Sequence, residues 1–162
     1  MDIKKLISEI IPHSDYQHRN GFSKNKIIDK LNDDEKTQTA NELMSLLLTT
    51  QDDMLIVETL GYMRSKKSLP ILKDLLKSTP YEMSKIIISS AIYEINHDNS
   101  MIEIALAALK KLPNIYYLTD AFFCLVKFNN PTLNDVIKEY TNHPDNLVSF
   151  NAKRALEMLK SN

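Results

Sequence analysis

The sequence predicts an all-α protein, and three observations support this. Apolar residues recur at helical spacing almost from end to end, and Pro, Asn, Asp, Ser and Thr occupy the breaks between them. Only two of the 162 residues are glycine, so the tight turns of a β-sheet would lack their usual residues. We expect ten helices in five antiparallel pairs, over residues 2–11, 23–32, 34–49, 52–64, 68–78, 81–96, 99–112, 115–129, 131–142 and 145–160.

The expected helix starts carry short polar side chains that can accept hydrogen bonds from the free N–H groups of a first helical turn. We expect such caps at Ser23, Asp33, Ser68, Asn99 and Asp145.

The expected helices repeat with a period of 31 to 33 residues. Four registers follow this period together: Ile56, Ile88, Ala121 and Ala152; Thr59, Ala91, Cys124 and Ala155; Leu60, Ile92, Leu125 and Leu156; Met63, Ile95, Phe128 and Leu159. Within each helix these positions form one apolar stripe, at i, i+3, i+4 and i+7. We therefore expect the third register to be nearly fully buried, because stacked repeats must cover this stripe.

The segment 68–76, with sequence SLPILKDLL, is followed by a turn at Pro80 and an inner helix carrying Lys85. This segment resembles a HEAT repeat, and residues 58–63 are similar to the ending of bacterial HEAT-like repeats. The basic inner-helix position of the family is Lys85 here, but Asp53, Leu118 and Ser149 in the other repeats. The resemblance implies a right-handed α-solenoid, with an N-terminal cap over 1–32 and hairpins over 33–64, 68–96, 99–129 and 131–160. It also implies partner binding on a concave surface of inner helices.

Composition argues against several classes of enzyme. Two glycines cannot form the Gly-rich loop of a nucleotide-binding enzyme, and the four histidines lack the spacing of a zinc site. Cys124, the single cysteine, lies in a small-residue register and is expected to be a buried structural thiol. We expect no catalytic residue, no cofactor and no metal. A cytoplasmic location is expected, because no signal peptide and no membrane span is recognisable.

Charge is distributed in blocks although the net charge is only −1. Residues 31–60 have a balance of −6 and residues 61–90 a balance of +4. The acidic block fits either carboxylates placed in first helical turns or a binding patch. The basic block fits either a solvated rim or a phosphate-binding surface.

The partner-binding candidates are the inner-helix residues outside the apolar stripe, because Tyr, Phe and Arg dominate interface energetics. They are Asp53, Glu58, Tyr62, Tyr93, Glu94, Asp120, Phe123, Lys127 and Arg154. Tyr62 and Tyr93 are favoured as partner contacts, whereas Tyr116 and Phe123 fit equally well as packing between helices. The polar loop over 12–22 is an alternative site.

These features indicate a non-enzymatic module that binds a protein partner, without a small-molecule substrate, nucleic acid or membrane. Among small bacterial HEAT-like proteins, the chain is similar to an immunity protein that neutralises a cognate toxin. The alternatives are a scaffold or adaptor for an endogenous enzyme, and a nucleic-acid-binding or DNA-repair protein that uses the basic block.

Overall fold

The computed structural model describes residues 2–12, 24–50 and 53–160, and in these ranges the chain is helical without any strand. Each of the ten expected ranges overlaps one α-helix, so the all-α prediction is confirmed. The α-helices are α1 (Ile3–Ile10), α3 (Asn25–Ile28), α4 (Asp33–Thr49), α5 (Met54–Tyr62), α6 (Leu69–Ser78), α7 (Glu82–Asn96), α8 (Ser100–Leu109), α9 (Ile115–Leu125), α10 (Pro131–Glu139) and α11 (Asn146–Met158). Three 3-10 turns join them: η1 (Lys66–Ser68), η2 (Val126–Phe128) and η3 (Tyr140–Asn142).

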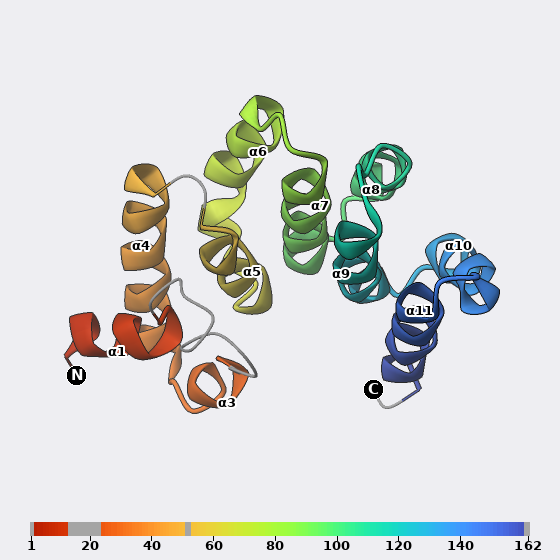
Figure 1. Ribbon diagram of the computed structural model, residues 1–162. Helices are drawn as coiled ribbons and strands as arrows, with labels where there is room; N and C mark the ends of the chain where they lie inside the picture. The colour runs from red at the N-terminus through yellow and green to blue at the C-terminus, as the bar shows by residue number, and fades with distance from the viewer. Residues whose placement is uncertain (1, 13–23, 51–52, 161–162) are drawn as a thin grey trace.

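The helices lie in chain order along an arc, with the two ends of the chain at its two ends (Figure 1). Helices α5, α7, α9 and α11 form an inner row along the arc. Helices α4, α6, α8 and α10 form the outer row. Helix α7 contacts α5 and α9 within the row and α6 and α8 outside it. None of the helices in the described ranges is long and apolar enough to cross a membrane.

The repeat registers form most of the core, while Met63, Leu156 and Leu159 are only half-buried. Leu60, Ile92 and Leu125 are completely buried, as expected. Leu156 is only half-buried, so that part of the prediction is wrong. Helix α11 is the last helix of the described chain, and its Leu156 side therefore has no following helix to cover it.

Helices α5 and α7 approach closely at Gly61. A Cβ atom built there would lie 2.8 Å from both Cα and Cβ of Ala91, closer than packed carbon atoms come. Glycine is therefore required by packing at this contact between the first two helices of the inner row.

The expected caps are confirmed in part. Asp145 accepts hydrogen bonds from the N–H groups of Leu147 and Val148. Asp33 is not the cap of α4, because Asn32 and Glu35 form a reciprocal capping box there. Ser68 and Asn99 make no capping bond, since both have helical backbone angles instead of the extended ones that a cap needs. Ser23 lies outside the described residues.

The helix expected over 23–32 is much shorter, at four residues in α3. Asn32 adopts an extended backbone to cap α4, so the preceding helix must end before it. The backbone N–H groups of Lys30 and Leu31 donate to carbonyls three residues back, which is the pattern of a turn and not of an α-helix.

The inner helices end in the same unusual backbone conformation. Arg64, His97 and Asn129 have positive φ values of 50°, 55° and 45°, in the left-handed region. They follow α5, α7 and η2 at intervals of 33 and 32 residues. The period seen in the apolar residues is therefore present in the backbone as well.

Candidate functional site

A groove of about 340 Å³ crosses three consecutive helices of the inner row. Four predicted site residues line it, namely Glu58, Asp120, Phe123 and Lys127. The remaining lining residues are Met54, Met83, Ile87, Tyr117 and Cys124. Side chains from α5, α7, α9 and η2 thus combine an apolar wall with charged groups.

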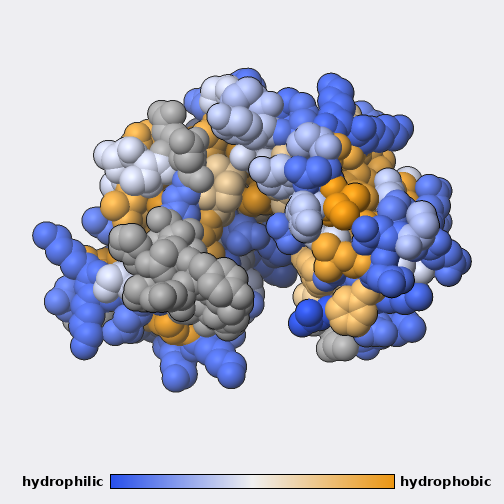
Figure 2. Space-filling model, in the orientation of Figure 1, coloured by the Kyte–Doolittle hydropathy of each residue, from blue (hydrophilic) through white to orange (hydrophobic). Residues whose placement is uncertain are grey.

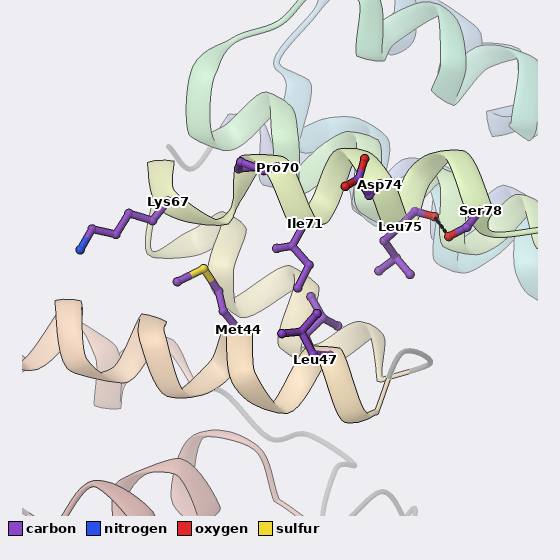
Figure 3. A pocket seen from close by; sticks show the side chains of 9 residues that line it. Met44, Leu47, Lys67, Pro70, Ile71, Asp74, Leu75 and Ser78 are labelled. Atoms are coloured by element: carbon purple, nitrogen blue, oxygen red, sulfur yellow. Dashed lines mark hydrogen bonds between the residues drawn. The ribbon is translucent and has the colours of Figure 1, made fainter.

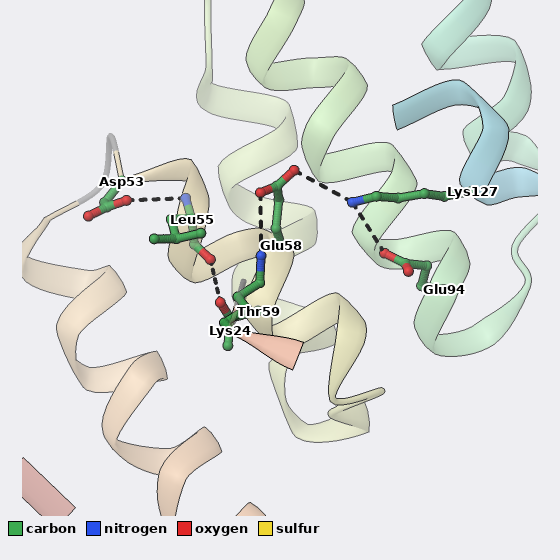
Figure 4. A network of polar contacts seen from close by, with 7 residues as sticks. All are labelled: Lys24, Asp53, Leu55, Glu58, Thr59, Glu94 and Lys127. Carbon is green, nitrogen blue, oxygen red and sulfur yellow. Dashed lines mark hydrogen bonds and ion pairs between the residues drawn. The ribbon is translucent and has the colours of Figure 1, made fainter. Parts of the chain in front are cut away.

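The charged side chains beside the groove form a network of ion pairs (Figure 4). Glu58 lies 3.6 Å from Nζ of Lys24 and 3.5 Å from Nζ of Lys127, and Lys127 lies 4.0 Å from Glu94. Two ammonium groups and two carboxylates therefore neutralise one another. Three predicted partner contacts, Glu58, Glu94 and Lys127, already have partners within the chain.

Glu94 is a member of this network with a buried carboxylate oxygen. Its Oε2 atom is buried and accepts no hydrogen bond from any described residue, and the ammonium of Lys127 is at the limit of an ion pair. Desolvation raises the pKa of Glu94, more than the neighbouring lysines lower it. Desolvation by burial lowers the pKa of the Lys24 ammonium, although the attraction of the Glu58 carboxylate raises it.

We expect the stability difference between wild type and Glu94→Gln to depend on pH. The pKa of Glu94 is higher in the folded than in the unfolded chain, so the unfolded chain releases the proton first. The wild type should therefore lose stability relative to the variant as pH rises from about 4 toward neutrality. Urea unfolding at four pH values between 4.5 and 7.5 measures the difference. Glu103→Gln, an exposed carboxylate on α8, is the control, and a difference for Glu94→Gln that does not change with pH would contradict the expectation.

Three other predicted site residues also make contacts within the chain. Asp53 caps α5 by accepting a hydrogen bond of 3.1 Å from the N–H of Leu55. The hydroxyl of Tyr62 donates to Asp29 at 2.7 Å and ties α5 to the turn after α3. The ring of Tyr93 lies 4.8 Å from that of Phe128 and 5.3 Å from that of His97. Each of these residues therefore has a structural role.

Asp120 and Arg154 are the predicted charged residues that remain exposed without an ion pair among the described residues. Desolvation by the apolar wall of the groove raises the pKa of the Asp120 carboxyl. Arg154 lies on α11 in the register of Glu58 and Phe123. Both charges are available to a binding partner.

Several exposed apolar residues were not among the predicted site residues. Tyr117 lines the groove, while Leu147, Phe150 and Met158 are exposed on α11. Tyr116 is 68% exposed and Phe150 is 61% exposed. Figure 2 shows hydrophobic side chains gathered on this face over α9 and towards α11. Two of them could have been found from the sequence, because Tyr116 and Leu147 follow Met83 of the groove at the repeat intervals of 33 and 31 residues.

A second, larger cavity of about 580 Å³ lies between α4 and α6 (Figure 3). Its walls are mostly apolar and include Met44, Leu47, Ile71 and Leu75. None of the predicted site residues lines it. The alternative site at 12–22 lies outside the described residues except for Pro12.

No protein-family model, curated protein or solved structure matches this chain. The described residues also contain no group of three or more His, Cys, Asp or Glu side chains that could hold a metal ion. The functional interpretation therefore depends on the geometry of the groove and of the charges around it.

Cys124 lies at the base of the groove but is buried, as its register predicts. Burial raises the pKa of its thiol to about 12, so the reactive thiolate is scarce at neutral pH. We expect iodoacetamide to alkylate the native protein on the order of 100-fold more slowly than the urea-unfolded chain. Mass spectrometry of quenched samples gives both rates. Equal rates would show that the thiol is accessible and would reopen a chemical role for it.

Proposed function

We propose that this protein is a non-enzymatic protein-binding module, built as a right-handed α-solenoid of four HEAT-like hairpins behind an N-terminal cap. The observation that carries the proposal is the groove across α5, α7 and α9, together with the exposed apolar side chains of Leu147 and Phe150 on α11. Aromatic and Met side chains that are exposed together are typical of protein interfaces. The repeated left-handed turns after the inner helices support the solenoid assignment.

The charges on this surface support a role in choosing the partner. The network centred on Glu58 is internally neutral, so it contributes little net field to an approaching molecule. Asp120 and Arg154 keep their charges exposed beside the apolar surface. Because such charges steer encounters and reject partners with the wrong sign, we assign them to specificity. Tyr117, Phe123 and Phe150 supply the apolar contact area.

The specific form that we propose is an immunity protein that occupies a bacterial toxin. This step depends on the fold resemblance, and fold alone does not determine function. The immunity role requires that the captured partner be a toxin, and that its activity stop when an equimolar amount of this protein is added. A captured endogenous enzyme that stays active in the complex would instead favour the adaptor role.

The binding surface is tested by alanine substitution in the full-length protein. A partner is first identified by pull-down from the native cell, and affinities are then measured by interferometry. We expect Tyr117→Ala and Phe123→Ala each to weaken binding by about 1–3 kcal/mol, since few interface residues carry most of the energy. Tyr62→Ala and Tyr93→Ala are poorer tests, because they also remove contacts within the chain.

The matched control is Tyr81→Ala, an exposed tyrosine that does not line the groove. Unchanged affinity for both groove variants would contradict the assignment of this surface. Asp120→Lys should mainly slow association at low ionic strength if the partner is basic. Faster association would mean that the partner is acidic at this position.

A further inference from the structure

The six basic residues between 61 and 90 divide into two groups. Lys73 lies 3.7 Å from Asp98, Lys77 lies 3.4 Å from Asp74, and Lys85 lies 2.9 Å from Glu82. The other three, Arg64, Lys66 and Lys67, form no ion pair with any described residue. Half of the basic block thus forms ion pairs with neighbouring carboxylates, and the other half forms none with a described residue.

The three cations without an ion pair line one cavity of about 360 Å³. Lys36 joins them from the first turns of α4. The remaining lining residues are Asp33, Thr37, Ala40, Asn41, Met63 and Ser65. Two segments that are about thirty residues apart in the sequence therefore bring four cations to one place, against the single carboxylate of Asp33.

The chemistry of this lining suits an oxyanion with several charges. Arginine and lysine side chains bind phosphate oxygens through charge-assisted hydrogen bonds. The side chains of Thr37, Asn41 and Ser65 add neutral donors. The lining contains no aromatic ring on which a nucleobase could stack.

The turn after α5 carries one of these cations. Arg64 occupies it in the left-handed conformation that His97 and Asn129 share in the later turns. Lys67 borders the apolar cavity between α4 and α6 as well, but its ammonium points away from the apolar side chains there (Figure 3).

We propose that this cavity is a binding site for a small phosphate-rich anion, such as a pyrophosphate or triphosphate group. The site shares no lining residue with the groove across α5, α7 and α9, so it is independent of the proposed protein-binding function.

Isothermal titration calorimetry of the full-length protein with pyrophosphate and with tripolyphosphate tests the proposal. The double variant Lys66→Ala/Lys67→Ala should bind at least tenfold more weakly than wild type, and added salt should weaken wild-type binding. The matched control is Lys73→Ala/Lys77→Ala, which removes two paired cations of the same block and should stay within about twofold of wild type. Circular dichroism verifies that both variants are folded.

Three results would overturn the proposal: no binding of either probe at millimolar concentration, equal affinity of wild type and Lys66→Ala/Lys67→Ala, or an equal loss in the control. A single-stranded oligonucleotide of mixed sequence provides the last arm. If it bound far more tightly than tripolyphosphate with the same sensitivity to Lys66 and Lys67, the cavity would belong to a nucleic-acid surface, and the small-anion assignment would be wrong.

Discussion

Leu125→Ala should lower the free energy of unfolding by about 2–5 kcal/mol, because Leu125 is completely buried in the inner row. The loss combines the transfer energy of the removed methyl groups with the cost of the cavity that remains. Its equivalent in the last repeat, Leu156, is only half-buried. Leu156→Ala should therefore cost less than half as much, and it is the matched control.

Urea unfolding followed by circular dichroism measures both variants in parallel. Equal losses at the two positions would mean that the end of the chain is covered in solution, for example by a second copy. A loss below 1 kcal/mol for Leu125→Ala would contradict its place in the packed register.

Gly61→Ala should destabilise the protein by about 1–3 kcal/mol, although alanine is the better helix former by roughly 1 kcal/mol. The added Cβ would lie 2.8 Å from two atoms of Ala91, one of which is the backbone Cα. Helices α5 and α7 would therefore have to move apart. The groove that both helices line should change with them.

A second substitution tests the cause of this loss. Ala91→Gly removes one of the two clashing atoms, so Gly61→Ala/Ala91→Gly should be more stable than the sum of the single effects predicts. Simple additivity in thermal unfolding would show that the two positions are not in contact. Ala107→Gly, at an exposed position of α8, measures the propensity cost of Ala→Gly without the packing term.

The fold was largely predictable because its signals are local and periodic. The burial of Leu60, Ile92 and Leu125 follows from a spacing that repeats along the chain. Leu156 has the same spacing but is only half-buried, because burial also requires a neighbouring helix. The predicted length of α3 was wrong for a related reason: Asn32 caps the start of α4 and therefore cannot extend α3.

The site was predictable in location but not in detail. Register placed Glu58, Phe123 and Lys127 on one surface, and the structure brings them to one groove. Register does not reveal contacts between distant segments, such as Tyr62 with Asp29 or Glu58 with Lys24. A count of charges has the same weakness, because it cannot distinguish Lys73, which pairs with Asp98, from Lys67, which forms no ion pair with a described residue.

The ion-pair network has a consequence for the cooperativity of unfolding. In a linear array of helices, opening can begin at either end and spread from neighbour to neighbour. The Glu58 carboxylate pairs with two lysines that are about a hundred residues apart. Lys24 lies at the start of α3 and Lys127 lies in η2. Opening of α3 or of η2 therefore removes a counter-charge from the same half-buried carboxylate. The region between them should open as one unit, whereas α11 has no ion pair to this network among the described residues and is held by packing against α9, α10 and η2.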